Sequence, residues 1–313
     1  MITLVFSLAA CGKKTEPKNI SVACIKGPTG VGMVQLMDNA EKGNGENNYN
    51  FKVVSSADEI SGKIISGEIN IASVPTNLAA KLYNKTQGKI VMLAVNTLGV
   101  LSIMENGNTI KSVADLKGKT IYSTGKGSNP EYILRHILKE NGLDPDRDVK
   151  LQFLAANDEL VASLVSGKAQ VALVPEPAAS TVNAKKSTVN KVLDVNEEWE
   201  KISDSKLMMG CIVALKSYVE ANPDAVKSFL KEYKTSVEFA ENNIQNTAEL
   251  CEKYGIIPSR QVAEKAIPDC NLTFATGKEM QNSIRGYFEV LLNADKMSIG
   301  GNMPKEDFWY NEK

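Results

Sequence analysis

The sequence is poor in the side chains that carry most enzyme chemistry. Its 313 residues include one histidine, His136, and four arginines. A His-rich metal site is therefore excluded, and a Ser-His-Asp or Cys-His arrangement could use only His136. That residue falls in the predicted helix 132–140, well after its first turn, which favours a structural or surface role. The motifs GxSxG, GxxxxGK(S/T), CxxC and HExxH are missing too, so we expect no enzyme, no catalytic residue, no metal site and no cofactor.

The sequence also lacks an excess of one charge and any long apolar run. Lys plus Arg number 36 and Asp plus Glu number 37, so the net charge of -1 gives no reason to expect nucleic acid as a partner. No apolar run approaches the roughly 18 residues that a membrane span needs. At roughly 150 residues per domain, a chain of this length is expected to form about two globular domains.

The first 18 residues differ from this globular body. Residues 1–10 are apolar, and Leu8-Ala9-Ala10-Cys11 looks like a bacterial lipobox, in which a signal peptide is cleaved and the cysteine receives a lipid. We therefore expect lipidation of Cys11, a tether over residues 12–18, and an extracytoplasmic protein anchored to the membrane. No positively charged segment precedes the apolar stretch, and a frayed apolar N-terminus is the alternative.

The chain contains an internal repeat. Residues 58–75 read DEISGKIISGEINIASVP, and residues 158–175 read DELVASLVSGKAQVALVP, with seven identities at an offset of 100 positions. The same offset aligns residues 51–54 with 151–154, and Lys26-Gly27 with Lys126-Gly127. One register thus covers three successive elements.

Both copies show the same order of secondary-structure signals. A strand (20–25; 120–123) enters a Gly-containing turn, followed by a stretch with apolar residues at helical spacing that ends at Gly43 or Gly142. A second strand (51–54; 149–154) and a helix closed by Gly67 or Gly167 follow, and a third strand ends at Pro75 or Pro175. This is βαβαβ twice, which predicts an α/β protein of two similar Rossmann-like lobes with largely parallel sheets.

The turns after these strands form the predicted ligand site. In open sheets of this class, ligands bind at the carboxyl ends of the strands, where turns lead into helix N-termini. The same residue types also make ordinary helix caps and tight turns, which is the alternative. The candidates are Gly27, Pro28, Thr29, Gly30, Pro75, Thr76, Asn77, Thr124, Gly125, Lys126, Gly127, Ser128, Asn129 and Glu176.

Four segments together resemble a known family: ISVACIKGPTG, ISGEINIASVPTNLA, IKSVADLKGKTIYSTGKGSNPEYILRHILKENGL and LVSGKAQVALVPEP. Their order is similar to that in the substrate-binding lipoproteins of bacterial ABC importers, in the branch that binds nitrate, sulfonates, taurine and thiamine precursors. The resemblance covers roughly residues 19–243. It implies the type II periplasmic-binding-protein fold, and a monomer that hands a small molecule to the permease and ATPase subunits of an importer.

The resemblance also implies a discontinuous first lobe, built from residues 19–97 and 211–313, with residues 98–210 as the second lobe. The chain would cross near 95–99 and return near 208–214, two apolar segments that contain a glycine and suit a two-stranded hinge. Asn96 and Thr97 would then lie at the floor of the cleft. A plain loop is the alternative for both residues. Helices are expected at 223–243 and 246–254 to complete the first lobe.

The charges in the predicted turns bear on the ligand. No arginine falls there, which argues against a bidentate clamp on a phosphate or dicarboxylate. Lys126 could face a sulfonate or only water. Glu176 could accept a hydrogen bond from an amine or amidine, as in an aminopyrimidine, or be a solvated loop carboxylate. Candidate stacking residues, each with a core or surface role as the alternative, are Tyr122, Tyr83 and Trp199.

Two further functions stay open at this stage: an enzyme of the same fold related to a pyrimidine-precursor synthase, and a ligand-sensing domain. The four cysteines other than Cys11 do not distinguish between these two functions. Cys24 and Cys211 fall in predicted strands and are expected to be buried, whereas Cys251 and Cys270 could form a disulfide in an oxidising compartment.

Overall fold

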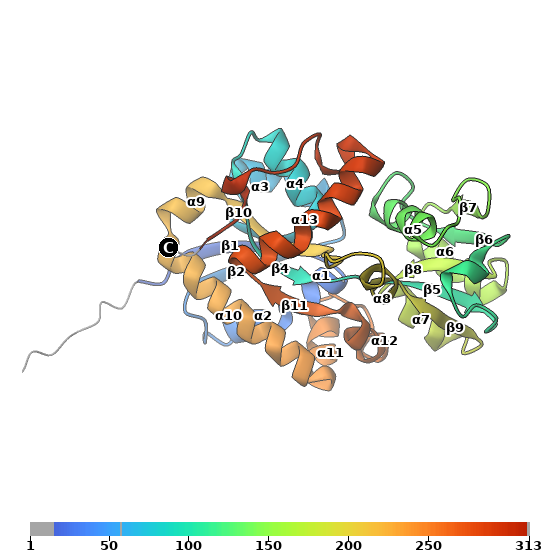
Figure 1. Cartoon of the computed structure of the whole chain (residues 1–313). Helices are drawn as coiled ribbons and strands as arrows, with labels where there is room; N and C mark the ends of the chain where they lie inside the picture. Colours follow the sequence, from blue (N-terminus) through green and yellow to red (C-terminus); the bar gives the residue numbers. More distant parts are fainter. Residues whose placement is uncertain (1–15, 57, 312–313) are drawn as a thin grey trace, which may run out of the picture.

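The computed structural model describes residues 16–56 and 58–311 and contains two β-sheets flanked by helices (Figure 1). The N-terminal segment that carries Cys11 lies outside the described residues. The strands are β1 (Asn19–Ile25), β2 (Asn48–Val54), β3 (Ile71–Pro75), β4 (Ile90–Thr97), β5 (Leu101–Asn106), β6 (Thr120–Ser123), β7 (Lys150–Phe153), β8 (Val171–Pro175), β9 (Val189–Asp194), β10 (Gly210–Leu215) and β11 (Leu272–Ala275).

The α-helices agree with most of the predicted positions. They are α1 (Pro28–Val31), α2 (Val34–Glu41), α3 (Asp58–Ser66), α4 (Thr76–Lys85), α5 (Asn129–Glu140), α6 (Asn157–Ser166), α7 (Ala178–Lys185), α8 (Val195–Glu200), α9 (Lys216–Ala221), α10 (Pro223–Asn242), α11 (Ile244–Lys253), α12 (Arg260–Ala266) and α13 (Gly277–Ala294). The described residues also form four short 3-10 helices: η1 (Val113–Leu116), η2 (Ile267–Cys270), η3 (Lys296–Ile299) and η4 (Glu306–Phe308).

The two sheets repeat one topology. The first sheet has the order β11-β4-β10-β3-β1-β2 and the second has the order β7-β6-β8-β5-β9. In each sheet three parallel strands come from one βαβαβ copy, and the third of them pairs with an antiparallel strand, β10 or β5. The predicted α/β fold with two similar lobes is confirmed. We call the first sheet with its helices the first lobe, and the second sheet with its helices the second lobe.

The register of the repeat needs one correction. Val22 pairs with Phe51 and Ile71, and Ile121 pairs with Leu151 and Val171, so the first strands of the two copies are offset by 99 positions and the other strands by 100. The predicted alignment of Lys26-Gly27 with Lys126-Gly127 is therefore wrong by one residue. Strand register is fixed by which side chains face the core, and the one-residue difference falls between the first and second strands of each copy.

One predicted helix is divided in the structure. The apolar spacing before Gly43 predicts one helical stretch, but α1 ends at Val31 and α2 begins at Val34. At Gly32, between them, a Cβ atom would lie 2.9 Å from Val237 Cγ2 of α10. The break thus coincides with a close approach between the backbone and a neighbouring helix, which apolar spacing along the sequence does not reveal.

Buried side chains join the lobes where the chain crosses between them. One continuous apolar cluster includes residues of both sheets, such as Val74 and Leu173, and it contains Trp199 of α8, which is 0% exposed. The Trp199 ring contacts Tyr287 of α13 edge-on at 5.8 Å and His136 of α5 at 5.2 Å. Trp199 is therefore a packing residue between the lobes and not a stacking partner for a ligand.

The four cysteines in the described part of the chain are free and buried: Cys24, Cys211, Cys251 and Cys270. The expected burial of Cys24 and Cys211 in strands is confirmed. The disulfide considered between Cys251 and Cys270 is not formed in this structure. Within residues 16–56 and 58–311, no helix has both the length and the apolar composition that a bilayer crossing demands.

Candidate functional site

Polar groups converge at the carboxyl ends of β1, β3 and β4 in the first lobe. The main-chain oxygen of Thr29 accepts hydrogen bonds from Ser73 Oγ at 2.7 Å and from Asn96 Nδ2 at 3.1 Å. Asn96 Nδ2 also lies 3.0 Å from Ser73 Oγ and 2.9 Å from the Tyr233 hydroxyl. Since Ser73 and Asn96 are almost fully buried, this network holds the α1 turn at the end of the sheet.

Gly210 allows this network to pack closely. It begins β10, and a Cβ atom there would lie 2.6 Å from Thr29 Cγ2 and 2.7 Å from Asn96 Oδ1. Thr97, the last residue of β4, donates from Oγ1 to Asn96 Oδ1 at 3.1 Å. Asn96 and Thr97 are each 1% exposed, so both are buried at the end of β4.

The turn after β3 is attached to the segment that returns from the second lobe. Thr76 donates through its main-chain nitrogen to Met209 O at 3.0 Å and through Oγ1 to Met208 O at 2.7 Å. Thr76 is fully buried, while the neighbouring Asn77 is partly exposed at the start of α4. Asn77 is therefore better placed than Thr76 to reach a ligand.

In the second lobe, the turn after β6 is held by bonds within that lobe. Ser128 Oγ donates to Gly125 O at 2.6 Å, and Thr124 Oγ1 donates to Asn157 Oδ1 at 2.8 Å. The main-chain nitrogen of Gly127 donates to Glu131 Oε2 at 2.8 Å. Lys126 is exposed, and Asn129 is buried at the start of α5.

Glu176 is the ionisable group buried at the end of β8. It is 5% exposed, so the alternative of a solvated loop carboxylate is wrong. Its Oε2 accepts from the main-chain nitrogen of Ser180 at 3.2 Å, and its own nitrogen donates to Val100 O at 2.9 Å. Burial raises the pKa of Glu176 to about 7, and the nearby charge of Asp269 adds to that rise.

The two lobes contact each other at the predicted turns. A Cβ atom on Gly27 of the first lobe would lie 3.8 Å from Pro177 Cδ of the second lobe, beside Glu176. Lys191 Nζ forms an ion pair with Asp269 Oδ1 at 3.1 Å, and the Tyr132 hydroxyl donates to Asp295 Oδ2 at 2.9 Å. The Gly27 turn and the Glu176 turn therefore face each other across the boundary between the lobes.

Sequence reasoning missed three residues of the first-lobe network: Ser73, Tyr233 and Gly210. Ser73 carried a signal, because it is a polar residue in a buried strand where the second copy of the repeat has Leu173. Gly210 was predicted only as the glycine of a hinge segment, and Tyr233 had no signal in the local sequence. Their roles depend on α10 and β10, which are distant in the chain.

The other candidate side chains have structural partners. Tyr83 is buried, and its hydroxyl donates to Asp307. Tyr122 packs against the small core of the second lobe. All four arginines form ion pairs with nearby carboxylates outside the predicted turns: Arg135 with Glu131 and Asp146, Arg147 with Asp144, Arg260 with Glu249 and Glu264, and Arg285 with Glu306.

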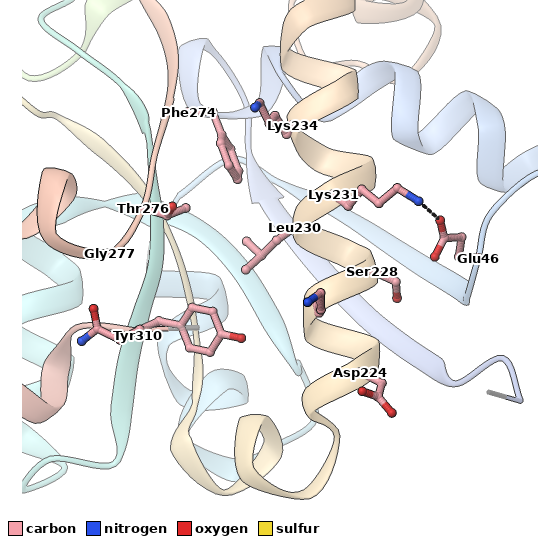
Figure 2. A pocket seen from close by; sticks show the side chains of 12 residues that line it. Glu46, Asp224, Ser228, Leu230, Lys231, Lys234, Phe274, Thr276, Gly277 and Tyr310 are labelled. Atoms are coloured by element: carbon pink, nitrogen blue, oxygen red, sulfur yellow. Dashed lines mark hydrogen bonds and ion pairs between the residues drawn. The ribbon is translucent and has the colours of Figure 1, made fainter. Parts of the chain in front are cut away.

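A separate cavity of about 790 Å³ lies between α10 and the C-terminal segment (Figure 2). Phe274, Leu230 and Tyr310 line it, and Lys231 forms an ion pair with Glu46 at its edge, with Nζ 2.9 Å from Oε1. None of its lining residues belongs to the predicted turns. It is therefore distinct from the candidate site between the lobes.

Comparison with protein families gives a match over most of the chain. A family described as "ABC transporter, phosphonate, periplasmic substrate-binding protein" matches residues 34–258. The chain belongs to this family. It is thus an extracytoplasmic solute-binding protein of an ABC importer, whose partners are a small molecule and the permease and ATPase subunits. The family is one of transport proteins and not of enzymes, so nothing supports the enzyme alternative.

Solved structures share the fold across nearly the whole chain. An ABC transporter protein from Parabacteroides distasonis is 22% identical, with a TM-score of 0.80, and the alignment covers 94% of this chain and 99% of that one. The aliphatic sulphonate-binding protein SsuA from Escherichia coli is 17% identical, with a TM-score of 0.73 and coverage of 95% and 94%. The nitrate-binding protein NrtA from Synechocystis PCC 6803 is 15% identical, with a TM-score of 0.58 and coverage of 85% and 75%. A search of curated proteins found no match.

Proposed function

We propose that this protein captures a small organic or oxyanionic solute between its two lobes and delivers it to the importer. The observation that carries this proposal is the network of Thr29, Ser73 and Asn96 at the strand ends of the first lobe, opposite the Glu176-Pro177 turn of the second. Buried hydrogen bonds hold the first-lobe turn in one geometry. Because this turn is already ordered, the protein loses less conformational entropy when a ligand binds to it.

In this proposal, residues of the predicted turns contact the solute. The partly exposed residues of these turns, which can touch a solute directly, are Pro28, Thr29, Pro75, Asn77, Thr124, Gly125 and Ser128. Exposed members are Lys126 and Gly127. The buried members Gly27, Gly30, Thr76, Asn96, Thr97 and Asn129 would position them, and Glu176 would face the solute from the second lobe.

Closure is proposed to involve two rigid parts, residues 19–97 with 211–313 and residues 98–210. The first crossing lies between β4 and β5, and the second ends where β10 begins. Few residues separate the strands at the first crossing, so changes at a small number of dihedral angles could open and close the cleft. A solute that binds the closed form more tightly than the open form would favour closure.

The identity of the solute can be approached through the proteins of similar fold. Two proteins of similar fold are named for aliphatic sulphonate and for nitrate, and the family is named for phosphonate. The test uses the full chain with Cys11→Ala, which prevents lipidation, and measures thermal unfolding with sulfonates, nitrate, phosphonates, bicarbonate, taurine, aminopyrimidines and thiamine. A solute at about 100 times its Kd stabilises the native state by about 2.7 kcal/mol, a readily measured shift.

A pair of variants tests the site itself. Thr29→Val keeps the side-chain shape but removes a hydroxyl at the proposed cleft, and we expect it to weaken binding of the identified solute about two- to tenfold. Thr188→Val makes the same change at an exposed residue of the second lobe and should leave the affinity unchanged. Equal affinities for both variants and the parent would overturn the proposed position of the site.

Membrane attachment and oligomeric state are further parts of the proposal. The Leu8-Ala9-Ala10-Cys11 motif supports lipidation of Cys11, so the native chain should fractionate with membranes and the Cys11→Ala chain should not. Light scattering on the purified Cys11→Ala chain should give the mass of a monomer. A dimer at micromolar concentration would contradict the proposed monomer. A native chain that stays out of the membrane fraction would contradict lipidation of Cys11.

A further inference from the structure

The short crossing from the first sheet to the second is bound by one residue of the first lobe. Residues 98–100 form this crossing, between β4 and β5. The main-chain oxygen of Asn271 accepts from Leu98 N at 2.9 Å, and its Nδ2 donates to Gly99 O at 2.5 Å. Asn271 lies directly before β11, which pairs with the end of β4. The first lobe thus holds the crossing through two bonds to a single residue.

The second lobe binds the same crossing from the other side. Asn196 Oδ1 of α8 accepts from Gly99 N at 3.3 Å, and Glu176 N donates to Val100 O at 2.9 Å. Gly99 is therefore the residue at which bonds to the first lobe give way to bonds to the second. Hydrogen bonds weaken steeply when their length or angle changes, so a rotation of the lobes about Gly99 must strain or break at least one of these bonds.

Gly99 is also enclosed by the segment that returns to the first lobe. A Cβ atom there would lie 2.9 Å from Asn196 Cβ and 2.9 Å from Leu207 Cδ2 of the returning segment. That segment is bonded to the end of β4, since Met209 N donates to Thr97 O at 2.9 Å. The two crossings are packed against each other, so a movement of one must shift the other.

The backbone of Asn271 has a conformation that few side chains adopt. Its φ is 44°, in the left-handed region, and among the described residues only Gln87 shares a positive φ without being glycine. Glycine would reach this region more easily than asparagine. Glycine, however, has no side-chain amide that could donate to Gly99 O. The presence of asparagine here is therefore explained by its bond to the crossing.

We propose that Asn271 is a positioning residue of the hinge, which holds the crossing in the arrangement where the two lobes touch. This inference rests on the proposed function, because it concerns closure of the same two lobes. The same short segment carries Asp269, which pairs with Lys191 of the second lobe at 3.1 Å. Loss of the Asn271 amide should increase the population of open arrangements and leave the surfaces that contact the solute intact.

The test measures the distance between the lobes in the unliganded protein. Spin labels are attached to Ser55→Cys and Ala155→Cys in the full Cys11→Ala chain. Both residues are exposed and follow β2 and β7, at the carboxyl ends of these strands, while the four described native cysteines are buried. Pulsed electron paramagnetic resonance gives the distribution of distances between the labels. In Asn271→Gly, we expect the fraction of long distances to rise roughly two- to tenfold, as the loss of one hydrogen bond predicts.

Two further variants make the result specific to the amide. Asn271→Asp tolerates the same φ and has nearly the same size, but its carboxylate offers no N–H to Gly99 O, so it should open the lobes as Asn271→Gly does. Gln87→Gly introduces glycine at the other positive φ, in the turn between α4 and β4, and should leave the distances unchanged.

The outcomes separate this inference from the function on which it rests. If both Asn271 variants give the distances of the parent chain, or if Gln87→Gly opens the lobes as much as they do, the inference is wrong. The proposed function then stands, because solute binding is measured separately by thermal unfolding. If the Asn271 variants open the lobes but no solute in the thermal-unfolding series binds, the inference stands and the proposed solute class is wrong.

Discussion

Lys191 of β9 and Asp269 of η2 form an ion pair that joins the two lobes, with Nζ 3.1 Å from Oδ1. Lys191 is also bound by Asp194 of its own lobe at 2.8 Å, which orients its side chain toward the boundary. On another part of the boundary the Tyr132 hydroxyl bonds to Asp295. The lobes are thus held by polar contacts at more than one point as well as by the core around Trp199.

We expect Asp269→Asn to weaken solute binding by two- to fivefold. The pair is partly exposed, so its loss costs about 0.5–1 kcal/mol of the closed form. The apparent affinity falls as the population of the closed form falls. Calorimetry would measure the affinity, and X-ray scattering of the bound state would measure the population of the closed form. Glu238→Gln removes a partner of Lys234 on the surface of α10 and should leave affinity unchanged. Equal effects of both variants would mean that the Lys191 pair does not stabilise closure.

Gly210→Ala should destabilise the protein by about 1–3 kcal/mol, because the new methyl group would lie within 2.8 Å of Thr29, Asn96 and Thr97 atoms. Urea unfolding would give the change in free energy. The matched variant Gly62→Ala places a methyl group in α3 with no atom within 4 Å, and should stabilise by about 0.5–1 kcal/mol. Similar stabilities of the two variants would show that the Asn96 network can relax around the methyl group.

Glu176→Gln should raise the stability of the unliganded protein above neutral pH. Burial raises the pKa of Glu176 from 4.5 to about 7, so the native state loses stability relative to the unfolded state as pH rises from 4.5 through 7. The variant avoids this loss and should gain up to about 3 kcal/mol at pH 8 and little at pH 4.

The charged groups that act on Glu176 are Asp269 and Lys191, and the Cys270 thiol lies close enough to feel its charge. Asp269 opposes ionisation of Glu176 and Lys191 favours it. Urea unfolding at pH 4 and pH 8 measures the predicted gain. A gain of the same size at both pH values would show that Glu176 is not a buried titrating carboxyl.

The four described cysteines should be unreactive in the native protein. Burial raises the pKa of Cys24 and of Cys251 to about 12, and raises that of Cys211 and Cys270 well above the usual range, so almost no thiolate exists at pH 8. Ellman's reagent should find no fast-reacting thiol in the native Cys11→Ala chain and all four in urea. Recovery of only two thiols in urea would reveal a disulfide between Cys251 and Cys270.

The sequence by itself determined the order of the elements in both copies of the repeat. Apolar periodicity, glycine at helix ends and the repeat of Gly67 and Pro75 as Gly167 and Pro175 predict strands and helices that the structure confirms within a few residues. These signals are local, because each depends on the conformation of a short segment. Parallel pairing then follows from the βαβ connections.

Only the tertiary structure decided how the site is supported. Ser73, Asn96, Thr29 and Tyr233 come from distant parts of the chain, and no local pattern predicts that they share hydrogen bonds. The one-residue change of register between β1 and β6 depends on which side chains each sheet buries. The burial of Glu176 is likewise a product of tertiary packing, because the solvation of a charged group is set by everything that packs around it.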